Sequence, residues 1–284
     1  MSVTRLAIAL SHLLLTATAL AAGVEIPFDP VRGLVEVPVV IDGRVKGTFG
    51  IDTGADRLYI DSSFAHENGL TSVASPPQRA VVGVDGVSEA SFVKLRSLRL
   101  GKEGLYNITA TAIDLTQIIK DRRLGMPDGL IGYDILRRFF VTVDYPKRML
   151  RLDVSPPPFT RGSADAFPFI RYRSERHMIV VEATLNDSIR VPMALDYCAS
   201  YTTLSPSLAS RLALDPSKDG PQKVDRVSLE GLSDAQDVLV VVADLSRFKK
   251  AVKGSTIDGI IGASFLYRHK FTIDYKAERI YIHR

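Results

Sequence analysis

The chain has 284 residues, of which 46% are apolar and 24% charged, an ordinary composition for a globular protein. The net charge of +4 does not predict nucleic-acid binding, because basic residues are scattered among acidic ones and no aromatic-rich basic motif occurs. The length allows one large domain or two small ones. We therefore expect a folded protein that has no nucleic acid as a partner.

Residues 1–21 have the pattern of a signal peptide. Arg5 precedes an apolar stretch from Leu6 to Leu20, and small residues flank the expected cleavage point after Ala21, with Ala22 as the second choice. The stretch is short for a membrane span, although an uncleaved anchor is the alternative. We expect an exported protein, periplasmic or secreted, without stable membrane insertion after cleavage.

The rest of the chain repeats itself once. Asp52-Thr53-Gly54-Ala55 follows the apolar run Val45–Ile51, and Asp196 follows a similar run from Ile189 to Leu195. The matched segments, in chain order, are 52–70 with 196–214, 128–132 with 258–262, and 140–145 with 270–275. Matches in the same order imply a duplicated lobe, with a spacing too long for a solenoid repeat.

A proline triplet within residues 155–162 predicts a stiff linker between the two lobes. The predicted lobes are residues 22–154 and 163–284. The later lobe is shorter, since Asp258 follows Asp196 by 62 residues whereas Asp128 follows Asp52 by 76. The missing piece is assigned to a hairpin at 94–107 of the first lobe.

Each lobe is predicted to consist mainly of strands. Strands at 35–41 and 45–51 flank Asp42-Gly43, and strands at 181–185 and 189–195 flank Asn186-Asp187, both typical of hairpin turns. Short helices are expected at 62–68, 133–138, 207–212 and 263–267. The fold class is therefore all-β with a few short helices.

Each repeat places an aspartate on the turn after a strand, which suggests chemistry by a pair of carboxylates. Two aspartates about 3 Å apart cannot both ionise and share a proton. One then acts as a base on water, while the protonated one polarises a peptide carbonyl. Gly54 allows close approach of backbone or substrate, and the Thr53 hydroxyl can hydrogen-bond across the axis between the lobes.

These residues resemble the retropepsin-like aspartic peptidases, in a bacterial exported form with two fused lobes. The resemblance rests on Asp52-Thr53-Gly54-Ala55 and on Asp128-Gly129-Leu130-Ile131-Gly132, and it covers nearly all of the mature chain. It implies two tandem acid-protease β-barrel lobes related by a pseudo-twofold axis, with Asp52 and Asp196 as the catalytic pair. The residues implied to support the site are Thr53, Gly54, Ala55, Gly132 and Gly262.

The resemblance also implies a flap that closes over the substrate, for which residues 80–87 are the candidate. Val82, Gly83, Val84 and Gly86 would contact the substrate there, and an ordinary surface hairpin is the alternative. In the second lobe, Glu230-Gly231 is matched to this flap.

The second aspartate has unusual neighbours. Tyr197 stands where the family has a hydroxyl residue, and it is too large to brace the lobes in the same way. Cys198 replaces the glycine. This lone cysteine is expected to be a small buried apolar residue, with a catalytic thiol as the alternative.

The function predicted is an aspartic-type endopeptidase that acts on peptide or protein substrates as a monomer. No cofactor is expected, and the histidines lack metal-ligand spacing, so no metal is expected either. Two alternatives stay open. One is a homodimer that is active only through two copies of the first lobe, and the other is a non-catalytic peptide-binding protein.

Overall fold

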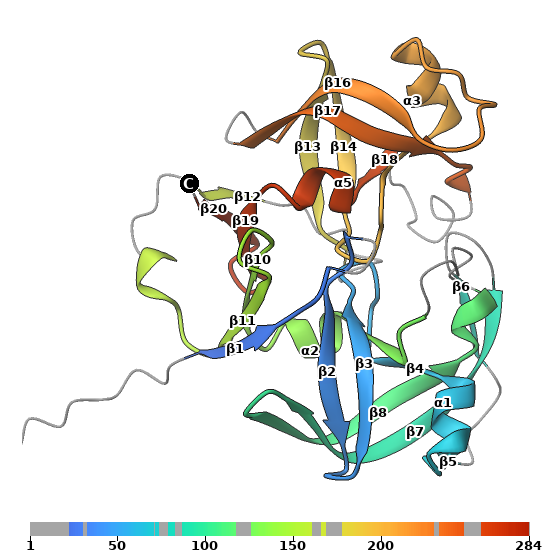
Figure 1. Ribbon diagram of the computed structural model, residues 1–284, viewed down its shortest axis with the longest axis vertical. Helices are drawn as coiled ribbons and strands as arrows, with labels where there is room; N and C mark the ends of the chain where they lie inside the picture. The colour runs from blue at the N-terminus through green and yellow to red at the C-terminus, as the bar shows by residue number, and fades with distance from the viewer. Residues whose placement is uncertain are drawn as a thin grey trace, which may run out of the picture.

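We describe the protein from a computed structural model. It describes residues 23–30, 33–70, 72–73, 79–82, 87–117, 126–160, 166–168, 178–229, 233–246 and 257–283. Two β-barrel lobes lie on either side of a six-stranded sheet (Figure 1). In the described segments, no helix is long and apolar enough to cross a membrane. The expected signal peptide, residues 1–21, lies outside them.

The first lobe is a six-stranded barrel. Its strands, in spatial order, are β2 (Glu36–Ile41), β3 (Val45–Ile51), β9 (Gly129–Ile131), β4 (Tyr59–Asp61), β8 (Glu103–Ile113) and β7 (Val87–Leu100). β2 also pairs with β7, which closes the barrel. The short strands β5 (Ser72–Val73) and β6 (Arg79–Val82) both pair with β7. Helix α1 (Ser62–Glu67) begins at Asp61, whose side chain caps it.

The second lobe repeats this barrel strand for strand. Its spatial order is β13 (Val180–Leu185), β14 (Ile189–Leu195), β18 (Gly259–Ile261), β15 (Thr202–Leu204), β17 (Ser233–Val242) and β16 (Gln222–Leu229). Among its described residues, helix α3 (Pro206–Arg211) corresponds to α1, and helix α5 (Ala263–Leu266) corresponds to α2 (Tyr133–Leu136) of the first lobe. The predicted all-β class with a few short helices is confirmed.

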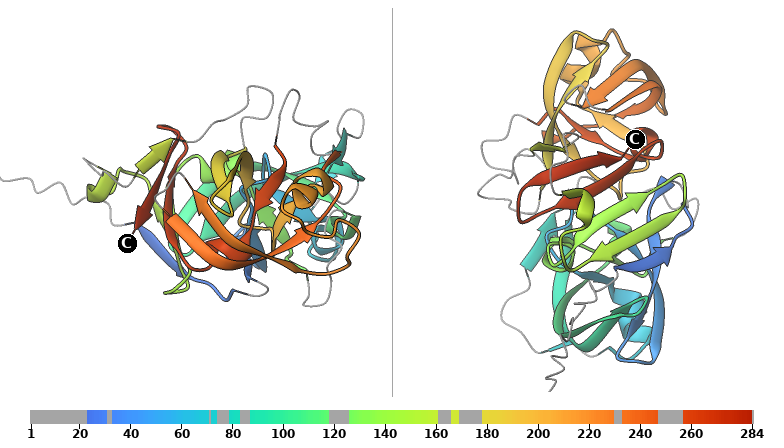
Figure 2. Two further views of the ribbon diagram at one scale, coloured as in Figure 1. Left: turned by 90° about the horizontal axis from the view of Figure 1, so that it is seen from above. Right: turned by 90° about the vertical axis from the view of Figure 1, so that its left-hand side faces the viewer.

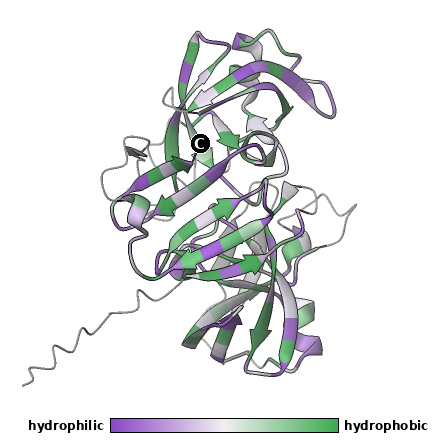
Figure 3. Cartoon of the chain, turned by 60° about the vertical axis from the view of Figure 1, so that its left-hand side comes forward, coloured by the Kyte–Doolittle hydropathy of each residue, from purple (hydrophilic) through white to green (hydrophobic). Residues whose placement is uncertain are grey.

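Local sequence explains the hairpins that open each barrel. Asp42 and Gly43 both have positive φ, at 51° and 72°, as do Asn186 and Asp187, at 45° and 56°. Short polar residues and glycine tolerate this conformation, which a tight hairpin turn requires. In β2 and β13, buried residues alternate with more exposed ones, and this alternation fixes which face packs inward. Figure 3 shows hydrophobic and hydrophilic residues mixed along the strands.

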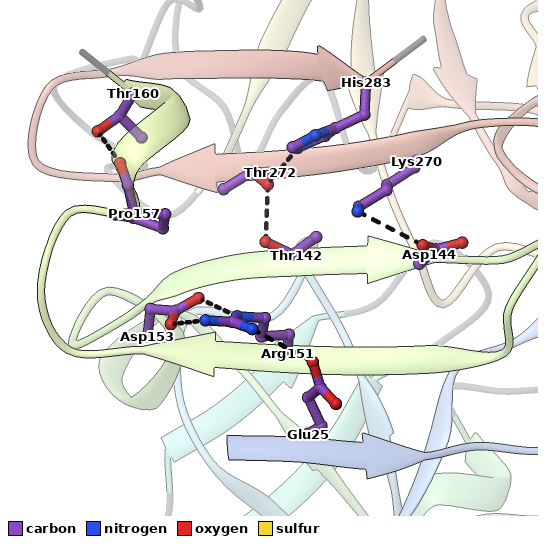
Figure 4. A network of polar contacts seen from close by, with 10 residues as sticks. All are labelled: Glu25, Thr142, Asp144, Arg151, Asp153, Pro157, Thr160, Lys270, Thr272 and His283. Atoms are coloured by element: carbon purple, nitrogen blue, oxygen red, sulfur yellow. Dashed lines mark hydrogen bonds and ion pairs between the residues drawn. The ribbon is translucent and has the colours of Figure 1, made fainter. Parts of the chain in front are cut away.

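The six-stranded sheet joins the halves (Figure 2). Its strands, in order, are β1 (Val24–Pro27), β11 (Met149–Asp153), β10 (Phe140–Asp144), β19 (Lys270–Asp274), β20 (Arg279–His283) and β12 (Ala166–Pro168). Thr142 of β10 lies opposite Thr272 of β19, and their Oγ1 atoms are 2.7 Å apart (Figure 4). These threonines occupy equivalent positions in the two repeats. The pseudo-twofold axis therefore passes between them.

The length difference between the lobes was assigned to the wrong hairpin. Leu100 of β7 lies opposite Val39 of β2, and Leu229 of β16 lies opposite Ala183 of β13, so the two hairpins that follow are equivalent. The hairpin at 94–107 therefore has a counterpart in the second lobe. The additional residues of the first lobe lie between Leu70 and Leu100, in the segment that contains β5 and β6. The length difference alone could not show which hairpin has no counterpart in the second lobe, because the β6–β7 and β7–β8 hairpins both consist of antiparallel strands.

The same equivalence corrects the match of Glu230-Gly231 to the flap. These two residues lie outside the described segments, but β16 and β17 on either side correspond to β7 and β8. Their connection is thus the counterpart of the turn at Gly101. The predicted linker, 155–162, contains a 3₁₀ turn at Pro158–Thr160. The bounds of the linker and of the two lobes stay predictions.

Candidate active site

The Asp52 loop folds around its own carboxylate at the end of β3. The Asp52 N–H donates to Ile131 O of β9 at 3.0 Å, which continues the parallel pairing of the two strands by one residue. Gly54 N and Ala55 N then donate to Asp52 Oδ1, at 2.8 and 2.9 Å. Backbone N–H groups that converge on a carboxylate fix its position. Asp52 is buried.

The Asp196 loop repeats this geometry at the end of β14. Asp196 N donates to Ile261 O of β18 at 2.9 Å, and Cys198 N donates to Asp196 Oδ1 at 2.7 Å. The second barrel thus holds Asp196 through β14 and β18, the strand pair equivalent to β3 and β9, although the residues that follow the two aspartates differ.

The two carboxyl groups meet beside Gly54. A Cβ atom placed on this glycine would lie 3.0 Å from Asp196 Oδ2 and 3.2 Å from Asp52 Oδ1, so the two carboxyls are close neighbours. Two carboxyl groups this close repel each other when both are charged, which favours a proton on one of them. The structure therefore brings together the two aspartates that the duplication predicted would meet.

The local environment favours this protonation. Burial raises the pKa of Asp52 well above its usual value, and the charge of Asp196 raises it further. Burial also raises the pKa of Asp196, against the opposing effect of the N–H group that Cys198 donates to its carboxylate. Because the two groups are in contact, their titration belongs to the pair rather than to either residue. The pair can act as acid and base together.

Thr53 links the two loops across the axis. Its Oγ1 donates to Leu195 O at 2.8 Å and accepts from Tyr197 N at 3.2 Å. Thr53 is buried. One hydroxyl therefore fixes the backbone on both sides of Asp196. This geometry matches the bracing role that the resemblance implied for Thr53.

Two glycines let each loop lie directly against its signature segment. A Cβ atom on Gly132 would lie 2.4 Å from Arg57 O, and one on Gly262 would lie 2.4 Å from Tyr201 O. A side chain at either position would therefore collide with the backbone of the neighbouring aspartate loop. Next to these glycines, Tyr133 N donates to Ala55 O at 2.9 Å. Each glycine therefore allows its signature segment to lie in close contact with the backbone of the aspartate loop.

The candidate flap lies only partly within the described segments. β6 and β7 pair antiparallel as far as Val82 opposite Val87, so a hairpin exists at the expected place. Gly83, Val84 and Gly86, which would form its tip, lie outside the described residues. Their role in substrate contact stays a prediction, as does that of Val82.

The two departures in the second loop occupy different environments. Tyr197 is completely buried, and its hydroxyl has no hydrogen-bond partner within the described chain. Cys198 is half-buried and packs against an apolar cluster of the first lobe that includes Ala55 and Leu130. The cysteine thus serves as a small apolar packing residue.

Sequence reasoning missed a polar group beside the first loop. Tyr59 donates to Asp56 Oδ1 at 2.5 Å, and Arg57 donates to Asp56 Oδ2 through Nε at 2.9 Å. Nearby Asp134 is largely buried, which raises its pKa to about 6. A signal was available, because Asp134 aligns with Ser264 in the second repeat and so departs from the duplication.

The described residues contain no group of three or more His, Cys, Asp or Glu side chains that could hold a metal ion.

Comparisons with known proteins agree with this geometry. A family model described as "Aspartyl protease" matches residues 37–135 and 181–265, one region in each lobe. Among solved structures, an aspartic proteinase from Irpex lacteus aligns with a TM-score of 0.60 at 10% identity, covering 92% of this chain and 97% of that one. At that identity the likeness concerns the fold. A search of curated protein sequences found no significant match.

Proposed function

This chain belongs to the aspartyl protease family, and from that premise we propose that it is an aspartic-type endopeptidase whose catalytic pair is Asp52 and Asp196. The observation that carries the proposal is the meeting of these two carboxyls, one from each lobe, beside Gly54. Aspartic proteases are the standard example of two carboxyls that share one proton.

The proposed reaction uses a water molecule as the nucleophile. The ionised carboxyl removes a proton from the water, whose oxygen attacks the peptide carbonyl carbon, while the protonated carboxyl donates to the carbonyl oxygen. In the resulting tetrahedral intermediate, the first carboxyl gives the proton it took from water to the peptide nitrogen, and the second carboxyl takes a proton back from a hydroxyl of the intermediate. The carbon–nitrogen bond then breaks and the amine leaves. Two peptides result, and the pair returns to its singly protonated state.

The shared proton predicts a bell-shaped dependence of cleavage on pH. Activity requires one proton on the pair, so it falls when both carboxyls are protonated and again when both are ionised. Burial and mutual repulsion raise the upper of these limits, because they disfavour the doubly charged state.

Incubation of the mature chain with an unfolded protein tests the proposal, across acid to neutral pH and with or without a statine-type inhibitor. We expect cleavage that the inhibitor blocks. Asp52→Asn is expected to abolish cleavage and to leave the circular dichroism spectrum unchanged. Retained turnover in this variant would exclude Asp52 as a catalytic group. Thr160→Ala is a suitable control, because Thr160 lies in the linker, where its hydroxyl bonds only locally to Pro157 O.

The homodimer alternative is disfavoured by the pairing of β10 with β19. These strands of one chain meet at the pseudo-twofold axis, where a second copy of the first lobe would have to lie. In a homodimer, Asp196→Asn would be harmless and the specific activity would fall on dilution. The single-chain proposal expects neither result.

The non-catalytic alternative is a peptide-binding protein that keeps the two lobes but no longer cleaves. The observation in its favour is that Tyr197 lacks the hydroxyl geometry of Thr53. It predicts that the chain binds unfolded protein without producing new N-termini. The retention of Asp196, which the second lobe holds beside Asp52 at Gly54, favours the enzyme instead.

We also propose export to the periplasm or to the medium, on the basis of residues 1–21. N-terminal sequencing of the protein from a secretion-competent bacterial host tests this proposal. A mature chain that begins at Ala22, or at Gly23 for the second cleavage choice, is the expected result. A chain that still begins at Met1 or Ser2 would contradict it.

A further inference from the structure

The two active-site loops are not braced in the same way. Thr53 serves both strand ends of the second lobe, through Leu195 O and Tyr197 N. A reciprocal brace would need a hydroxyl at position 197 that donates back to the first loop. The Tyr197 hydroxyl makes no hydrogen bond with any described residue, so this half of the brace is absent.

Aromatic packing occupies the place of the missing hydrogen bonds. Tyr197 is the largest fully buried side chain in the described protein. Its ring lies against that of Tyr145, with centroids 6.1 Å apart and planes tilted by 30°. Tyr145 follows β10 in the first lobe, and its hydroxyl donates to Gly33 O at 2.9 Å. Tyr197 therefore extends from the Asp196 loop into the part of the core that belongs to the other lobe.

Cys198 makes a second contact of the same kind. A Cβ atom on Gly50 would lie 3.5 Å from Cys198 Sγ, so the thiol fills space that this glycine leaves open. The repeat exchanges the two sizes: the counterparts of Gly50 and Cys198 are Ala194 and Gly54. The space that strand β3 leaves at Gly50 is thus filled by Cys198 of the opposing loop, so this departure in the second motif is matched by the first lobe.

We propose that Tyr197 is a positioning residue, which replaces the second hydroxyl of a reciprocal brace by packing on Tyr145 and thereby holds Asp196 beside Asp52. The unusual second motif then indicates a different way to align the pair and not the loss of alignment. The phenyl ring carries this role, and the hydroxyl has no part in it. The inference rests on the proposed function only where activity is the measurement.

Three variants separate the ring from the hydroxyl. Tyr197→Phe keeps the ring, Tyr197→Thr restores a family-like hydroxyl, and Tyr197→Thr with Cys198→Gly restores the full first-lobe pattern. We expect Tyr197→Phe to keep kcat within about twofold and to melt at the same or a higher temperature, because an unpartnered buried hydroxyl is removed. Tyr197→Thr should lose tenfold to roughly a hundredfold in kcat with little change in KM, since misplacement of a catalytic group acts on the chemical step.

Two outcomes would overturn the inference. If Tyr197→Phe loses activity while it folds normally, the hydroxyl is needed. If Tyr197→Thr, or the double variant, has the kcat and pH profile of the wild type, a hydroxyl brace serves as well as the ring. Should Tyr197→Thr fail to fold, Tyr145→Leu tests the same contact from the first lobe, with Tyr145→Phe as the control for the lost bond to Gly33. An unaltered kcat in Tyr145→Leu would then contradict the inference.

Failure of the proposed function is distinguished by a measurement that needs no substrate. Carboxyl titration by NMR follows Asp52 and Asp196 directly. If the wild type cleaves nothing, the endopeptidase proposal fails, yet the inference still predicts a raised, two-step titration that Tyr197→Phe keeps and Tyr197→Thr shifts towards the values of isolated aspartates. A titration that is identical in all three proteins would show that Tyr197 does not position the pair.

Discussion

In the first lobe, the loop after β3 reaches across the axis with a hydroxyl, and Thr53 hydrogen-bonds to the backbone on both sides of Asp196. In the second lobe, the loop after β14 reaches back with a buried ring, and Tyr197 packs on Tyr145. Both aspartates nevertheless accept backbone N–H groups and follow the same strand pairing. The barrels position the carboxyls, and the residues that follow each aspartate can differ as long as they fill the space between the lobes.

The largest effect is expected from neutralising either aspartate. If the two loops are equivalent in function, Asp52→Asn and Asp196→Asn should each lower kcat by at least about a thousandfold, because each removes one half of an acid–base pair. Steady-state kinetics on a peptide substrate measure both. A loss confined to Asp52→Asn would make the lobes unequal and would favour the homodimer.

The two supporting glycines should be equally intolerant of a side chain. In each lobe, a Cβ atom on the glycine, Gly132 or Gly262, would lie 2.4 Å from a backbone oxygen of the same lobe. We expect each change to Ala to lower the free energy of unfolding by about 1–3 kcal/mol, as overpacking typically does. Gly50→Ala is the control, since its nearest contact would be the end of the Leu130 side chain at 3.2 Å. If urea denaturation shows that Gly50→Ala loses as much free energy of unfolding as the other two variants, this account is contradicted.

The hydroxyl brace should matter more than the tyrosine hydroxyl. Thr53→Val removes two buried hydrogen bonds and should cost about 1–3 kcal/mol in the free energy of unfolding, because their partners are left unpaired. Thr53→Ser keeps the hydroxyl and should cost less than half as much. If Tyr197→Phe lowers the thermal unfolding temperature more than Thr53→Val does, the tyrosine hydroxyl matters more than the Thr53 hydroxyl, and the prediction is wrong.

The smallest effect concerns Asp134 and its counterpart Ser264. Ser264 Oγ accepts from Thr202 N at 2.8 Å, whereas Asp134 Oδ1 is buried and has no hydrogen-bond partner among the described residues. Burial raises the pKa of Asp134 to about 6. Because the folded state binds this proton more tightly than the unfolded state does, Asp134 makes the protein less stable as the pH rises from about 4 to 6.

Asp134→Ser should remove this contribution and copy the second lobe. The catalytic pair is present in both proteins, so the difference between the variant and the wild type isolates Asp134. We expect the variant to lose less stability than the wild type between pH 4 and pH 6 in urea denaturation. Equal slopes with pH in the two proteins would mean that the Asp134 carboxyl is not titrating in that range.

Much of the fold could be predicted from the sequence because the duplication is visible as matched segments in the same order. Alternating strands, Asp42-Gly43 and the repeated glycine signatures each have a direct physical cause in hairpin turns or close backbone contact. The contact of Asp52 with Asp196 followed from symmetry. The placement of the missing 14 residues did not, because only strand register shows that the hairpin after Leu100 corresponds to the one after Leu229.

The details of the second loop were also beyond the sequence. The sequence shows that Tyr197 is too large to brace the lobes through its hydroxyl as Thr53 does. Nothing in the sequence pattern indicates that its ring packs on that of Tyr145, 52 residues earlier. The exchange of volume between Gly50 and Cys198 likewise depends on a contact between lobes. Packing across an axis has no local signal, whereas a turn or a strand has one.

Binding stoichiometry for a statine-type inhibitor, measured by isothermal titration calorimetry at acid pH, tests the central claim most directly. A site made by Asp52 and Asp196 of one chain should bind one inhibitor per chain, and Asp52→Asn and Asp196→Asn should weaken binding alike. One inhibitor per two chains, or binding that ignores Asp196→Asn, would contradict the account.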